Sequence, residues 1–405
     1  MQNLLYKMPG FSEASQAIIK RNFPVMLSGL AGSSETLAAA SLFLKGGFKG
    51  AMLVIVPDSD QVNAWFADMK QLMPERQVLA FDPAESLPFE VVAASREPAA
   101  GRLQALASLC EQGENSVVIA SVEALLPKLV PPACWAKAAI SLQVNQETDY
   151  NGLLQRLVAA GYERSENVSG AGQFAVRGDV VDIYPFYDSP VRIEFWGDEI
   201  TSLRRLEPKS QRSQERIAEI IMWPAREFIY DEDLAATAVD GIKNAYQERR
   251  DVLKGSKDAQ LRLQRRANRY VEMTKEGIGG SLSLVQPYFY PEQSSLLDYL
   301  PPDSMVIIEE PGRFQEQCGA RTALLESDYR RFFQEGNSFT SWKEYYFDAD
   351  QLLEQMTDLS LLYFSQLSRR LPQIKPKSRF SFTTKEMQPF LGRPDLLVQE
   401  IKGWL

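Results

Sequence analysis

The sequence predicts an α/β protein in which a parallel sheet domain is interrupted along the chain by a small α+β domain. Between Phe23 and Ser121, short apolar runs alternate with amphipathic segments of helical length, the pattern of a parallel sheet that helices cover on both faces. The stretch Gly170–Ser213 alternates apolar and polar residues and is broken by turn signals, which indicates an antiparallel meander. A later apolar run, Ser304–Glu310, predicts a buried strand that joins the first sheet, so we expect the first domain to be discontinuous.

Composition excludes several kinds of chemistry. The chain has 405 residues, and its net charge of −9 does not favour nucleic-acid binding outside a local basic patch. It has no histidine, which removes histidine general bases, nucleophile pairs and metal ligands. Its cysteines, Cys110, Cys134 and Cys318, lie far apart without CxxC spacing, so we expect no metal site and a reducing cytoplasm. No apolar run reaches the roughly 18 residues of a membrane helix, so we expect no membrane contact.

The loop after the first apolar run is the candidate nucleotide site, because ligands of parallel α/β sheets bind at the carboxyl ends of the strands. Four strands are expected in this sheet before residue 138: Val25–Leu27, Ala51–Val56, Val78–Phe81 and Val117–Ala120. The first loop reads GLAGSSET and lies where a GxxxxGK[ST] phosphate loop would be.

This loop keeps the frame of a phosphate loop and lacks its chemistry. Gly29 and Thr36 fit the pattern and Gly32 lies between them, but Ser34 stands at the second fixed glycine and Glu35 at the lysine. A carboxylate there would repel the phosphates by several kcal/mol. We therefore predict a degenerate phosphate loop that binds no nucleotide and holds no catalytic residue. The alternative is a tight turn at Gly29 that never held a phosphate.

The meander is the candidate interaction surface. Its expected strands are Gln173–Val176, Val180–Pro185, Val191–Trp196 and Ile200–Leu206. A period of two places Arg192, Glu194 and Trp196 on the face opposite the apolar one, and it also turns Arg177 outward. Aromatic side chains beside arginine are typical of interface anchors. The other interpretation is that Arg192 and Glu194 form cross-strand surface pairs and that another segment covers Trp196.

A resemblance enters at these residues. FAVRGDVVDIYP followed by VRIEFWGDEITSLRRLEPKSQRS resembles the module shared by the damage-verification protein UvrB and the transcription-repair coupling factor Mfd. In both families this module docks UvrA. The resemblance therefore implies that Arg177, Arg192 and Trp196 contact UvrA, although the family position at Trp196 is often phenylalanine.

Two differences between this chain and UvrB favour the Mfd family. The loop of UvrB is intact, whereas Glu35 replaces the lysine here. UvrB also carries a long aromatic-rich hairpin after the third strand, but here the chain runs from Phe81 into a helix around Pro98–Leu109, which leaves too little chain for it. Phe89 is accordingly expected to be a core or capping residue. The chain resembles the N-terminal region of Mfd; the alternative is a UvrB-like ATPase that binds damaged DNA.

The rest of the chain completes the first domain. The run IIMWPAREFIY is expected to mark the return to it, and a long helical segment follows. Between Lys243 and Glu276 the chain contains ten lysine or arginine residues and five acidic residues. This excess of positive charge indicates a solvated helix face or else a DNA or partner surface. Glu309 and Glu310 lie where helicase-like modules carry acidic residues, and we interpret them as a structural relic and not as a magnesium site. The final FLGRPDLLVQEIKGWL predicts an amphipathic helix with nothing left to pack against, as in a chain cut from a longer protein.

The predicted organisation has four parts. A degenerate RecA/P-loop-like domain begins at 1–138, a UvrA-binding α+β domain is inserted at 139–218, the first domain returns at 219–370, and a linker and a following domain start at 371–405. We expect a non-catalytic, cytoplasmic, cofactor-free module that recruits UvrA to nucleotide excision repair. The resemblance implies an ATP-dependent DNA translocase as the parent, which binds RNA polymerase and double-stranded DNA through parts not present here. A free-standing UvrA-binding regulator is a further alternative.

Overall fold

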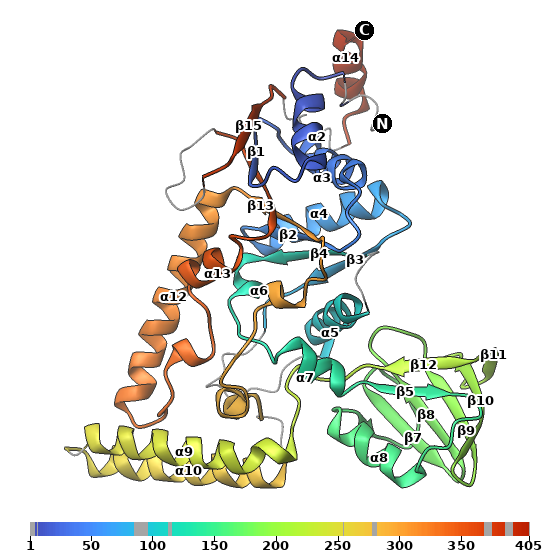
Figure 1. Ribbon diagram of the computed structural model, residues 1–405, viewed down its shortest axis with the longest axis vertical. Helices are drawn as coiled ribbons and strands as arrows, with labels where there is room; N and C mark the ends of the chain where they lie inside the picture. Colours follow the sequence, from blue (N-terminus) through green and yellow to red (C-terminus); the bar gives the residue numbers. More distant parts are fainter. Residues whose placement is uncertain are drawn as a thin grey trace.

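The core of the molecule is a seven-stranded parallel sheet with the strand order β15-β1-β14-β13-β2-β4-β3 (Figure 1). The computed structural model describes residues 5, 7–84, 96–111, 116–253, 255–277, 282–367, 375–384 and 392–404. The strands are β1 (Val25–Ser28), β2 (Met52–Val56), β3 (Gln77–Phe81), β4 (Ser116–Ser121), β13 (Met305–Glu309), β14 (Ser360–Ser365) and β15 (Ser378–Ser381). The predicted α/β class is confirmed, and so is the expectation that the run at 304–310 joins the first sheet.

Alternate residues of the strands pack into two separate hydrophobic cores, because successive side chains of a strand point to opposite faces of a sheet. One core takes residues such as Val54 and Ile307 together with helices α2 (Phe11–Ile19), α3 (Ser33–Gly46) and α4 (Ser59–Leu72). The other takes residues such as Leu53 and Ile308 with helices α5 (Arg96–Cys110), α6 (Val122–Leu125) and α12 (Pro311–Gln334). Helices therefore cover both faces, as the continuous apolar runs predicted.

A helical layer extends the second core away from the sheet. It consists of a hairpin of α9 (Glu232–Val252) and α10 (Lys257–Glu276), with α11 (Gln286–Phe289), α13 (Ala349–Gln355) and the short turns η1 (Leu282–Val285), η2 (Leu296–Tyr299) and η3 (Trp342–Glu344). Figure 1 shows the hairpin lying across the end of α12. On α10, Leu263, Ala267 and Tyr270 are buried at helical spacing, while most of its charged residues are exposed.

The small domain is a curved antiparallel sheet closed by a helix and a two-stranded ribbon. The sheet has the order β11-β10-β9-β8-β7-β6, and the ribbon pairs β5 with β12. The elements are β5 (Ile140–Gln143), α8 (Tyr150–Ala159), β6 (Glu163–Arg164), β7 (Gln173–Arg177), β8 (Val180–Tyr184), β9 (Val191–Trp196), β10 (Glu199–Leu206), β11 (Ser213–Ile217) and β12 (Glu219–Met222). Val191, Ile193 and Phe195 face a common core with Leu153 and Leu157 of α8, so the predicted apolar face is confirmed.

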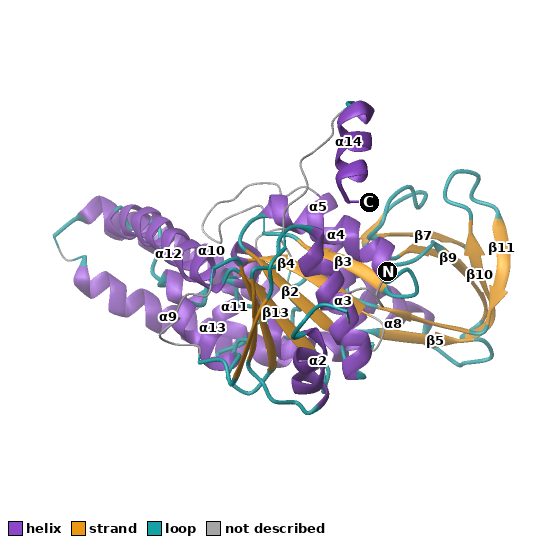
Figure 2. Ribbon diagram, turned by 90° about the horizontal axis from the view of Figure 1, so that it is seen from above, coloured by secondary structure: helices purple, strands orange, loops and turns teal. Residues whose placement is uncertain are grey.

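A polar and aromatic junction attaches the small domain to the sheet domain. Trp135, in α7 (Pro132–Lys137), stacks on Trp223 with ring centroids 5.4 Å apart and an interplanar angle of 9°. The Trp223 indole donates a hydrogen bond to Glu111, and buried Arg102 of α5 forms a bidentate pair with Glu227. Figure 2 shows the small domain on one side of the parallel sheet and the α9–α10 hairpin on the other.

Two predicted boundaries differ from the strand pairing. The run at 219–222 forms β12 and pairs with β5, because Ile220 and Met222 complete the core of the small domain. Residues 378–381, expected in a linker beyond the first domain, form β15 and cover the open edge of β1. Helix α14 (Pro394–Trp404) follows and stands away from the sheet (Figure 1).

Phe89 lies outside the described residues. No helix within the described ranges has the length and apolar character needed to cross a membrane.

Candidate docking face and predicted phosphate loop

The three predicted contact residues share the outer face of the small domain's sheet, opposite its core. Arg177 ends β7 and is exposed, Arg192 lies in the middle of β9 and is half-buried, and Trp196 ends β9. The side chain of Trp196 is 79% exposed. No other described segment covers it, so the interpretation in which Trp196 is capped is wrong.

Arg192 is engaged within the chain. Its Nε and one Nη donate to the two carboxylate oxygens of Asp182 on β8, at 2.7 and 2.8 Å. Asp182 is 2% exposed and Arg192 is 19% exposed, so this is a largely buried, bidentate pair between directly opposed residues. The hydrogen bond to Asp182 raises the pKa of Arg192. The cross-strand pairing that we considered for Arg192 therefore exists, with Asp182 as the partner, but the pair is largely buried and does not lie on the surface.

The strand register adds two arginines to this face that sequence reasoning missed. Arg192 lies directly opposite Arg204 on β10, and Arg204 lies directly opposite Arg216 on β11. Arg204 Nε donates to Ser202 Oγ at 3.0 Å, and Arg216 is exposed. A sequence signal for Arg204 was present in the alternation of β10, but the bulges in this strand interrupt the period of two on which the prediction relied.

The predicted phosphate loop connects β1 to α3 and is held by hydrogen bonds between its own residues. Ser34 Oγ accepts a hydrogen bond from Ala31 N at 2.9 Å and lies 2.7 Å from Ala31 O, to which it donates. The Thr36 hydroxyl, which would face a magnesium ion in an intact loop, donates instead to Asp68. Gly29 and Gly32 have positive φ angles of 77° and 56°. Gly29 is also closely packed, since a Cβ added there would lie 2.0 Å from the carbonyl oxygen of Phe382.

Glu35 is buried in the first turn of α3, with 5% of its surface exposed. Its side chain hydrogen-bonds that of Glu309 at the end of β13. Burial, followed by the neighbouring charges of Glu309 and Glu310, raises the pKa of Glu35 well above its usual range. Burial also raises the pKa of Glu309. A hollow of about 330 Å³ lies beside this pair and is lined in part by Arg313 and Glu316.

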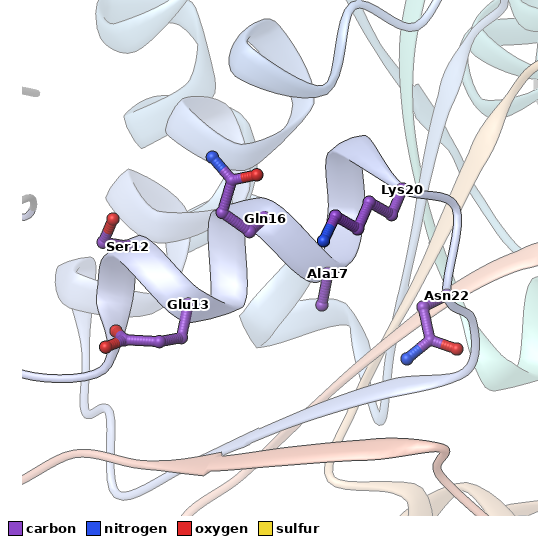
Figure 3. Close-up of a pocket in the computed structure, with 6 residues that line it drawn as sticks. All are labelled: Ser12, Glu13, Gln16, Ala17, Lys20 and Asn22. Atoms are coloured by element: carbon purple, nitrogen blue, oxygen red, sulfur yellow. The ribbon is translucent and has the colours of Figure 1, made fainter.

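A second hollow, of about 550 Å³, runs along the outer side of α2 (Figure 3). Its lining residues are Ser12, Glu13, Gln16, Ala17, Lys20 and Asn22. Figure 3 shows that these side chains point in different directions from α2 and the turn after it and do not converge on a point, so they form no candidate site. Among the residues that the structure describes, no group of three or more cysteine, aspartate or glutamate side chains could hold a metal ion.

Comparison with known proteins gives the class of the small domain first. Residues 140–228 match the model of the UvrB interaction domain, and this range contains the outer face described above. The whole chain is similar to transcription-repair-coupling factors. It is 29% identical to that of Bacillus subtilis (strain 168) over 93% of its own length, and 25% identical to that of Staphylococcus aureus (strain MRSA252) over 98%. The resemblance predicted from the motif is thereby confirmed. The chain spans about a third of the length of these relatives.

Proposed function

We propose that this chain recruits UvrA as the docking module of a transcription-repair coupling factor. The observation that carries the proposal is the exposed indole of Trp196, which shares one sheet face with Arg177 and Arg192 inside the part that matches the UvrB interaction domain. An exposed tryptophan forgoes a large burial gain, and a partner surface would recover it. The similarity to transcription-repair-coupling factors over nearly the whole chain supports the same partner.

The remaining functions of such a factor would reside in the two thirds of the relatives that this chain does not span. We propose that those parts bind RNA polymerase stalled at a lesion and double-stranded DNA, and that they move along DNA by ATP hydrolysis. The module would then link a stalled polymerase in the cytoplasm to nucleotide excision repair.

We further propose that this module is non-catalytic and binds no nucleotide. Ser34 occupies the interior of the loop with its hydroxyl, and Glu35 places a buried carboxyl group where a phosphate loop needs a lysine. Burial raises the pKa of Glu35 and of Glu309, which makes the pair a poor magnesium ligand, because a metal requires deprotonated oxygens. Calorimetric titration with ATP and magnesium should show no binding heat. A micromolar dissociation constant would favour the UvrB-like ATPase instead.

Binding of purified UvrA tests the docking role. Trp196→Ala should weaken binding by about thirtyfold, the typical effect of removing a large interface anchor, while Trp196→Phe should be mild. Val158→Ala is a matched control, because Val158 is 56% exposed on α8 of the same domain. If Trp196→Ala and Val158→Ala both bind like the unmodified chain, UvrA docks elsewhere. If the unmodified chain does not bind UvrA at all, the proposed function is wrong.

A further inference from the structure

We propose that Arg192, Arg204 and Arg216 form a row of guanidinium groups that receives a row of carboxylates on UvrA, with Arg204 and Arg216 as the free anchors and Asp182 as a positioning residue. We call these three residues the arginine row. The inference rests on the proposed function and deepens it, because it assigns an acidic surface to the partner and adds two contact residues.

The strand register brings the arginine row together. Residues directly opposite each other in an antiparallel pair project to the same face, and Arg192, Arg204 and Arg216 are opposed in turn across β9, β10 and β11. Their Cα atoms therefore span about 10 Å, two cross-strand spacings. The neighbouring inner positions, such as Ile193 and Leu203, lie in the core, which confirms that the row is on the outer face.

Asp182 divides the row into one occupied and two open guanidinium groups. It lies opposite Arg192 and takes both Nε and one Nη of that side chain, so Arg192 cannot present an open fork to a partner. Arg204 uses only its Nε, to Ser202 Oγ, and within the described part of the chain neither Arg204 nor Arg216 forms an ion pair. The two terminal nitrogens of Arg204 are therefore left to bind a carboxylate in bidentate geometry.

The charge of the face points to an acidic partner. Like charges directly opposite each other destabilise a sheet, and the arginine row places three in succession. The single carboxylate in line with them, Asp182, is buried and belongs to Arg192. Glu194 lies in the next row, opposite Val180 and Ser202. Asp182 offsets the charge of Arg192 alone, and carboxylates of a partner would offset those of Arg204 and Arg216.

The test compares UvrA binding and thermal unfolding of the same variants of the full chain. Arg204→Ala and Arg216→Ala should each weaken UvrA binding about tenfold and should reduce its dependence on salt, because each removes a charged contact. Their melting temperatures should be unchanged or raised, because each relieves a like-charge contact. Arg204→Lys should weaken binding less than Arg204→Ala, since it keeps the charge and loses the fork. Arg265→Ala is the matched control, because Arg265 is exposed on α10, outside the small domain.

The possible outcomes distinguish the role of the arginine row from the proposed docking function. If Arg204→Ala and Arg216→Ala bind UvrA like the unmodified chain while Trp196→Ala loses affinity, the arginine row is no part of the interface and the docking function stands. If binding falls only in variants whose melting temperature also falls, the arginines are structural and the inference is equally overturned. If the unmodified chain does not bind UvrA, the inference falls together with the proposed function.

Discussion

Replacing Glu35 by glutamine should stabilise the protein at neutral and alkaline pH. The structure places this carboxyl group at 5% exposure against Glu309, with Glu310 adjacent, in the position of a phosphate-loop lysine. Ionising Glu35 would therefore put a second negative charge into a site that water hardly reaches. Glutamine has nearly the same shape, cannot ionise, and can donate a hydrogen bond to Glu309.

The direction and the size of this stabilisation by Glu35→Gln follow from proton linkage. Burial raises the pKa of Glu35 in the folded state, whereas the unfolded chain ionises near the ordinary value of about 4.3. Above that pH the folded state holds a proton that the unfolded state has released, so stability is lost as pH rises towards the folded pKa. The slope from one such group approaches about 1.4 kcal/mol per pH unit. Between pH 5.5 and 7.5 the unmodified chain should thus lose about 2 kcal/mol that the Glu35→Gln variant keeps.

The assay is urea unfolding at several values between pH 5 and 8.5, followed by circular dichroism and tryptophan fluorescence. Glu316→Gln is the matched control, because Glu316 lines the same hollow but is exposed. We expect the control to follow the pH dependence of the unmodified chain and Glu35→Gln to flatten it. If Glu35→Gln has the same pH slope as the unmodified chain, or is less stable at pH 7.5, Glu35 is not protonated in the folded state and the reasoning fails.

Three further substitutions test the packing of the two sites by thermal unfolding. Arg192→Ala should destabilise the chain by about 2 kcal/mol or more, because it leaves a buried carboxylate unpaired; an unchanged melting temperature would show that water satisfies this carboxylate. Trp196→Ala should change stability by less than about 0.5 kcal/mol, since the side chain is exposed, and a marked loss would mean that the indole packs on the chain. Gly29→Ala should cost about 2 kcal/mol or more, because its positive φ and the close carbonyl oxygen leave no room for a Cβ. Gly47→Ala, with a similar φ and open space, should cost less, and equal losses would contradict the packing argument.

The sequence was sufficient for features that depend on neighbouring residues along the chain. The alternation in Val191–Trp196 predicted which side chains face the core, because a strand has a period of two whatever it pairs with. The continuous apolar runs predicted the parallel sheet that the structure shows. The motif in the small domain was long enough to predict the relatives that the comparisons confirmed.

Only the tertiary structure decided which distant residues meet. Asp182 and Arg192 form a buried pair because the hairpin register places them opposite each other, and the alternation within a single strand carries no register. The same holds for Arg204 and Arg216, and for β15, whose polar sequence gave no sign that it would cover the edge of β1. Glu35 and Glu309 meet because the helix that follows β1 begins near the carboxyl end of β13, although β14 lies between these two strands in the sheet. Such contacts depend on how the elements pack against one another, and packing is a property of the whole chain.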